Sequence, residues 1–185
     1  MRDTPAQYDA VVAQARDLFL KKAHDYGTSW RVLRPISVAD QIYIKARRIS
    51  QLQQSQQQMI ADDIPSEFIG IINYGIIGLI QLDLADDEND TLPLDTCKTL
   101  YEQKAAMARQ LMLLKNHDYG EAWRQMSQES FADLILTKVY RMKQIIRNKG
   151  VTLASEGLDA NYLDIINYAV FALILQQEEA VAGEK

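Results

Sequence analysis

The sequence contains the same element twice, and this duplication limits the fold more than any other feature. His24-Asp25-Tyr26-Gly27, with Trp30-Arg31 after it, returns 93 positions later as His117-Asp118-Tyr119-Gly120 and Trp123-Arg124. Residues 22–51 and 115–144 are identical at 14 of 30 positions, without a gap. Two copies are too few for a solenoid. We therefore expect the two copies to pack together around a pseudo-twofold axis.

Apolar residues recur at helical spacing in each copy, which predicts an all-α fold. In the first copy we expect helices over about 5–24, 38–58 and 66–83, with Ser37 and Ser66 as N-caps of the second and third. Gly27 suits the end of the first helix, and the glutamine-rich stretch 51–58 predicts an exposed helix face. The third segment is apolar nearly all round. A strand is the alternative there, but its length favours a central helix.

The expected architecture is six main helices from the tandem duplication of a three-helix unit. The first repeat covers residues 1–85, an acidic, proline-bearing linker covers 86–94, and the second repeat covers 95–185. We expect the two repeats to pack as one domain.

Composition narrows the range of partners. The net charge of -5 argues against direct nucleic-acid binding. The lone Cys97 fits a reducing compartment and has the pattern of a structural thiol. No signal peptide is recognised, and the longest apolar runs, of about 14 residues, are shorter than the roughly 20 needed to span a bilayer. We therefore expect a cytoplasmic protein that does not contact a membrane.

Charged residues retained in both copies are the first candidates for a site. Asp40, Lys45 and Arg48 fall on one broad helix face and return as Asp133, Lys138 and Arg141. Packing alone would preserve apolar character rather than particular charges. One interpretation is a structural salt-bridge network. The other is a phosphate clamp in which the acid orients the bases or holds Mg²⁺.

Two asparagines interrupt the most apolar helices at equivalent positions. Asn73 and Asn167 must be hydrogen-bonded if they are buried. They either form a cap or cross-helix bond in the core, or bind a ligand. Asp164 lies one turn before Asn167, where the first copy has Gly70, so a carboxylate–amide pair exists only in the second copy.

The duplicated turn has two interpretations as well. Asp25-Tyr26-Gly27 explains a helix end, but it does not explain why the aromatic residues and arginines persist. They could stack a nucleobase against Arg31 or Arg124, or fill the gap between the halves. The histidines are weaker candidates for general bases, because no nucleophile or further metal ligand accompanies them.

The patterns Lys-x-x-Asp-Tyr-Gly-x-x-Trp, Arg34-Pro35-Ile-Ser-Val-Ala-Asp-Gln-Ile-x-x-Lys-x-x-Arg-Ile and Ile-Asn-Tyr resemble the nucleotide-modification-associated domain of the first type. This is a bacterial and phage domain of unknown activity that is often found in tandem in Bacteroidetes proteins. Arg34-Pro35 is replaced by Ser127-Gln128 in the second copy. The layout is also distantly similar to the all-α nucleoside triphosphate pyrophosphohydrolases (MazG-like), whose Glu-x-x-Glu pattern is missing from the second helix of either half.

The resemblance implies a nucleotide-binding protein linked to nucleotide or modified-base metabolism, with a Mg²⁺-dependent pyrophosphohydrolase activity as one form. The alternatives are a non-catalytic adaptor module held by a salt-bridge network, and a homo-oligomer that associates through its third helices. No catalytic residue is assigned. The candidate ligands of the nucleotide are Lys45, Arg48, Lys138, Arg141, Tyr26, Tyr119, Arg31, Arg124, Asn73 and Asn167. The candidate Mg²⁺ ligands are Asp25, Asp40, Asp118, Asp133 and Asp164.

Overall fold

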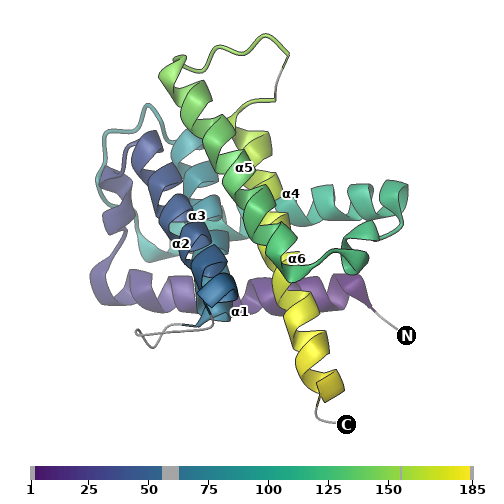
Figure 1. Cartoon of the computed structure of the whole chain (residues 1–185). Helices are drawn as coiled ribbons and strands as arrows, with labels where there is room; N and C mark the ends of the chain where they lie inside the picture. Colours follow the sequence, from purple (N-terminus) through teal and green to yellow (C-terminus); the bar gives the residue numbers. More distant parts are fainter. Residues whose placement is uncertain (1–2, 56–62, 155, 184–185) are drawn as a thin grey trace.

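The computed structural model describes residues 3–55, 63–154 and 156–183 (Figure 1). All regular secondary structure among these residues is helical. The first repeat contains α1 (Thr4–Tyr26), the short 3₁₀ turn η1 (Ser29–Val32), α2 (Pro35–Ser55) and α3 (Ile64–Asp83). The second contains α4 (Leu94–Tyr119), η2 (Ala122–Gln125), α5 (Gln128–Arg147) and α6 (Leu158–Gly183). The predicted all-α duplication of a three-helix unit is confirmed.

The six α-helices form three layers, each with one helix from either repeat. Helices α3 and α6 pack against each other at the centre. Helices α2 and α5 cover one side of this pair, while α1 and α4 lie across the other, running sideways to the rest in Figure 1. Because each layer pairs equivalent helices, the expected pseudo-twofold relation between the halves is confirmed.

Both predicted N-caps were wrong, because each helix begins earlier than expected, with a proline in its first turn. Helix α2 begins at Pro35, so Ser37 lies within its first turn. Proline is well suited to the first helical position, where its missing N–H costs nothing. Helix α3 is capped by Asp63, whose carboxylate accepts hydrogen bonds from the backbone N–H of Ser66 at 2.9 Å and its hydroxyl at 2.7 Å. Of the glutamine-rich stretch, residues 56–58 lie outside the described residues.

The duplicated turn ends a helix in each repeat, as predicted. Gly27 and Gly120 have φ angles of 70° and 60°, which favour glycine, and each donates its N–H to a carbonyl four residues earlier. The short 3₁₀ turns that follow direct Trp30 and Trp123 into the core. Trp123 stacks on Phe171 with 4.2 Å between ring centroids. The tryptophans therefore serve packing, whereas the tyrosines of the same motif stay outside.

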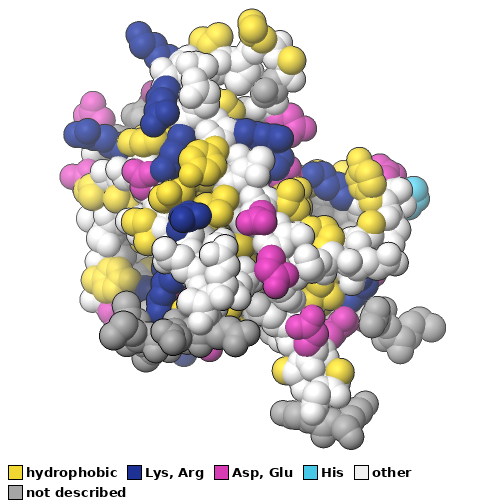
Figure 2. Space-filling view, in the orientation of Figure 1, with side chains coloured by type: hydrophobic (Ala, Val, Ile, Leu, Met, Phe, Trp, Pro, Cys, Tyr) yellow, Lys and Arg dark blue, Asp and Glu magenta, His cyan; other side chains and the backbone are white. Residues whose placement is uncertain are grey.

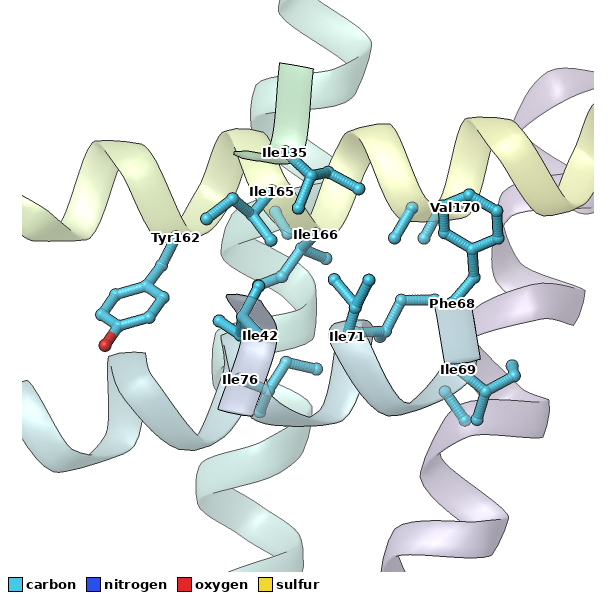
Figure 3. Close-up of a cluster of buried hydrophobic side chains, with 14 of the residues drawn as sticks. Ile42, Phe68, Ile69, Ile71, Ile76, Ile135, Tyr162, Ile165, Ile166 and Val170 are labelled. Atoms are coloured by element: carbon cyan, nitrogen blue, oxygen red, sulfur yellow. The ribbon is translucent and has the colours of Figure 1, made fainter. Parts of the chain in front are cut away.

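The central helices α3 and α6 approach closely at Gly75 and Gly78 of α3. A β-carbon added at Gly75 would lie 2.7 Å from the side chain of Ile166, and one added at Gly78 would lie 2.2 Å from the ring of Tyr162. Tyr162 and Ile166 are both buried. Side chains from both repeats thus interlock in one core, which Figure 3 shows from Phe68 to Tyr162.

Helices α3 and α6 are long and apolar enough to cross a membrane, although their apolar runs look short in the sequence. In the structure, 67% and 72% of their most apolar windows are buried among the other helices. This degree of burial is typical of the core helices of a globular domain.

Candidate functional site

The aspartates of the duplicated turns are exposed at the ends of α1 and α4. Among the described residues, Asp25 and Asp118 each pair only with the neighbouring histidine, at 3.5 and 3.0 Å from carboxylate oxygen to Nδ1. The tyrosines beside them are also exposed, Tyr26 by 59% and Tyr119 by 73%. An exposed tyrosine ring is available for stacking, whereas two exposed aspartates at separate helix ends do not form a joint metal site.

Arg31 and Arg124, the arginines that follow the duplicated turns, are held by hydrogen bonds within the protein. Arg31 donates to the side chain of Gln81 and, at 2.8 and 3.0 Å, to the carbonyls of Asp87 and Asn89. It thereby fixes the segment between α3 and α4. Arg124 is 8% exposed and binds side chains of both repeats. Its partners are Glu121 at 2.7 Å, Glu178 at 2.9 Å, Thr4 at 2.6 Å and Gln7 at 2.8 Å. Such saturation favours an anchoring role over a role on a nucleobase.

Asn73 and Asn167 form reciprocal hydrogen bonds across the pseudo-twofold axis. Asn167 accepts from the Tyr8 hydroxyl at 2.7 Å and donates to the carbonyl of Ala108 at 3.1 Å. Asn73 accepts from the Tyr101 hydroxyl at 2.8 Å and donates to the carbonyl of Ala15 at 3.1 Å. Each asparagine thus joins its own α3 or α6 to the first helices of both repeats. This geometry favours the cross-helix interpretation of the retained asparagines over ligand binding.

The basic pair of the first repeat meets a buried acid that the comparison of the two copies did not reveal. Lys45 lies 3.2 Å from Glu67, and Arg48 contacts the other oxygen of the same carboxylate. Glu67 stands on α3 and its side chain is 6% exposed. A carboxylate removed from water needs such partners, because an unpaired buried charge is strongly unfavourable.

In the second repeat, a different carboxylate is buried and paired with basic side chains. Asp164 on α6 lies 2.6 Å from both Lys115 and Lys138, and its side chain is 8% exposed. Burial raises the pKa of Asp164, but the hydrogen bonds and positive charges of the two lysines outweigh this effect, and the pKa is lowered. Arg141, the counterpart of Arg48, is exposed. Asp164 is therefore ionised at neutral pH and paired with the two lysines.

The remaining aspartates do not complete a metal centre. Asp40 forms a 2.5 Å ion pair with Lys143 on the partner helix α5, and Asp133 is exposed on α5 itself. Among the residues that the structure describes, no group of three or more His, Cys, Asp or Glu side chains is placed to hold a metal ion. Mg²⁺ is usually held by one or two protein carboxylates together with waters and substrate phosphates. The five candidate aspartates lie on different helices with separate partners and do not form one magnesium centre.

A cavity of about 560 Å³ opens in the first repeat between α1, α2 and α3. It is lined by polar and aromatic groups that converge from these helices, among them Lys22, Tyr26, Lys45, Glu67, Asn73 and Tyr74. Burial raises the pKa of Tyr74, and the neighbouring Tyr26 adds to this shift. Of the predicted ligands, the cavity brings together Tyr26, Lys45 and Asn73.

Three charged residues that line the cavity or pair with Asp164 were missed by the sequence comparison. Lys22 and Lys115 are identical in the two copies and begin the matching segment, so the signal was present. Glu67 left no such signal, because its equivalent in the second repeat is Asn161. A carboxylate that has moved along a helix is not identical at any one position, so the retained residues do not reveal it.

The ion pairs of Asp164 predict that the stability of the protein depends on pH. Since its pKa is lowered on folding, its stabilising effect is present above the ordinary carboxyl pKa of about 4 and is lost as the pH falls through the lower, folded-state value. Asp164→Asn should reduce the free energy of unfolding at pH 7 by about 2 kcal/mol, the scale of hydrogen bonds to charged groups. Urea unfolding at pH 7, 4 and 2.5 should show this difference shrinking.

Asp118→Asn is the control for this series, because the Asp118 side chain is 73% exposed. Its stability should stay within about 0.5 kcal/mol of the wild type. A deficit of Asp164→Asn that persists undiminished at pH 2.5 would show that lost packing, rather than lost charge, explains it.

Comparison with known proteins bears on both repeats. The family model for the nucleotide modification associated domain 1 matches residues 22–82 and again residues 115–175. No curated protein and no solved structure gives a significant match. The two matched segments contain the duplicated turn, the basic helix and the central helix of each repeat, which confirms the resemblance drawn from the sequence. The chain belongs to the nucleotide modification associated domain 1 family and carries two tandem copies of its domain.

Proposed function

We propose that the protein binds a nucleotide in the cavity of the first repeat and acts in nucleotide or modified-base metabolism. The single observation that carries this proposal is the convergence of two lysines and two tyrosines on that cavity. Its volume of about 560 Å³ falls in the range of small-molecule sites, which is roughly 300–1,000 Å³. The family description supports the same class of ligand.

The lining residues suit the two ends of a nucleotide. Lys22 and Lys45 offer ammonium groups to phosphate oxygens. Tyr26, whose ring is largely exposed, and Tyr74 beside it offer aromatic faces to a base. With Glu67 as the acid among these residues, Lys22 and Lys45 leave an excess of positive charge for an anionic ligand.

Lys22 is the best residue with which to test this site. No ion pair joins it to any residue in the ranges 3–55, 63–154 and 156–183, so its loss should not weaken the fold. Lys22→Met should lower the affinity for deoxynucleoside mono-, di- or triphosphates about 10- to 100-fold, the equivalent of one charge-assisted hydrogen bond. Isothermal titration calorimetry with this panel measures the change.

The matched control is Lys21→Met, which removes an adjacent lysine that does not line the cavity. It should bind nucleotides as the wild type does. Equal losses in both variants would indicate a non-specific charge effect, and an absence of binding by the wild-type protein to every nucleotide would overturn the proposal.

A second candidate function is a non-catalytic module, and the charge pairing favours it over hydrolysis. Glu67 and Asp164 are each held by two basic side chains, and Arg31 and Arg124 are held by internal hydrogen bonds. We therefore propose binding without turnover. Incubation with the deoxynucleoside triphosphates and Mg²⁺ should release no pyrophosphate above background. Release that disappears in Lys22→Met would instead establish an enzyme.

A further inference from the structure

The two repeats hold the same four charged groups, but the carboxylate lies one helical turn apart. Each repeat has a lysine on its first helix and a lysine and an arginine on its second: Lys22, Lys45 and Arg48 in the first, and Lys115, Lys138 and Arg141 in the second. In the register of the central helices, the sequence Glu67-x-x-Gly70 of α3 corresponds to Asn161-x-x-Asp164 of α6. The acid therefore stands at the first of these two positions in α3 and at the second in α6.

In the second repeat, the shifted acid fills the space between the two lysines. Lys115 from α4 and Lys138 from α5 both reach the Asp164 carboxylate, one to each oxygen, at 2.6 Å. Asn161, where the first repeat has its acid, instead donates to the carbonyl of Gly157 at 2.7 Å. The molecule thus shows directly that this pair of lysines can hold an oxyanion with two oxygens.

In the first repeat, the equivalent space holds no carboxylate. Glu67 lies one turn earlier and takes Lys45 and Arg48. Gly70 has no side chain, and the end of Lys45 lies over it: an added β-carbon would be 2.8 Å from Cε of Lys45. Lys22, Lys45 and Gly70 all line the cavity. A flexible lysine and an open cavity therefore replace the closed Lys–Asp–Lys arrangement.

We propose that the phosphate group of the ligand binds between Lys22 and Lys45 beside Gly70, and that Asp164 is a built-in carboxylate which occupies the equivalent position in the second repeat. This inference rests on the proposed function. Its consequence is one anion site per chain, despite two copies of the domain. The position of Gly70 and Asp164 decides which repeat binds.

The test exchanges the residues at this position and uses inorganic pyrophosphate as the titrant in calorimetry. The wild-type protein should bind one pyrophosphate per chain. Gly70→Asp should place a carboxylate between Lys22 and Lys45 and lower the affinity at least tenfold. Gly70→Asn is the matched control, because it adds a side chain of the same size without charge and should retain more of the affinity.

The reverse exchange should open the second repeat. Asp164→Gly should bind two pyrophosphates per chain, and Asp164→Asn, which removes the charge but fills the space, should bind the second one more weakly. Circular dichroism confirms that each variant is folded. If Asp164→Gly does not fold, the comparison of Gly70→Asp with Gly70→Asn still decides.

The outcomes separate this inference from the proposal on which it rests. Failure of the wild-type protein to bind both pyrophosphate and nucleotides would overturn the proposed function and the inference with it. Two pyrophosphates bound to the wild-type protein, or equal affinities of Gly70→Asp and Gly70→Asn, would overturn the inference alone. A folded Asp164→Gly that still binds only one would do the same.

Discussion

Asn167→Ala is expected to lower the free energy of unfolding by about 2–4 kcal/mol, although the residue is a polar side chain in one of the two apolar central helices. Its side chain accepts from the buried hydroxyl of Tyr8 and donates to the carbonyl of Ala108, at 2.7 and 3.1 Å. The substitution leaves the Tyr8 hydroxyl buried without an acceptor, which costs about 1–3 kcal/mol. It also removes the bond to the Ala108 carbonyl, which lies within α4 and keeps its helical partner, so this loss is about 1 kcal/mol. Chemical denaturation monitored by circular dichroism measures the loss.

A double-mutant cycle with Tyr8→Phe tests whether the hydrogen bond itself is responsible. Burial raises the pKa of Tyr8 well above its ordinary value, so the hydroxyl stays protonated and donates. The two substitutions remove the same bond, so the double variant should be more stable than the sum of the single losses indicates, by about 1–2 kcal/mol. Additive losses would contradict the proposed coupling. Gln144→Ala, on the exposed face of α5, should change stability by less than about 0.5 kcal/mol.

The same pair of bonds shows how far the sequence could specify this fold. The period of the apolar residues and the duplicated segment were sufficient to predict six helices and their pseudo-twofold relation. The order of the helix layers could not be predicted from the sequence, because it depends on which helix faces pack against each other. Tyr8 and Tyr101 occupy equivalent positions, 93 residues apart, on the apolar faces of the first helices of the two copies. Their hydroxyls acquire partners only when α1 and α4 cross the central helices.

The candidate site was predicted in part for a related reason. The repeat comparison identified Lys45 and Lys138 as retained charges, and both lie in the two Lys–carboxylate networks. It also selected Arg31, which is retained because it fixes a loop rather than because it faces the cavity. A residue that is identical in both copies is needed, but its identity alone does not show what it is needed for. Only the partners of each side chain distinguish an anchoring role from a binding role.

Gly78→Ala is expected to destabilise the protein by about 2 kcal/mol, even though alanine favours a helix over glycine by about 1 kcal/mol. The new β-carbon would lie 2.2 Å from the ring of Tyr162, which is buried between the repeats. Overpacking of this kind forces shifts of side chains and backbone. For a chain of this length the midpoint of thermal unfolding should fall by about 4–8 °C.

Gly70→Ala on the same helix is the matched control, because its new β-carbon meets only the flexible end of Lys45, which can move aside. This variant should gain from helix propensity and unfold at or slightly above the wild-type temperature. Combining Gly78→Ala with Tyr162→Leu should cost less than the two single losses together, since leucine removes the ring that the new methyl group meets. Equal thermal midpoints for Gly78→Ala and Gly70→Ala would contradict the close approach of α3 and α6 at this position. A clear difference would identify the contact between Gly78 and Tyr162 as a point at which the second repeat depends on the sequence of the first.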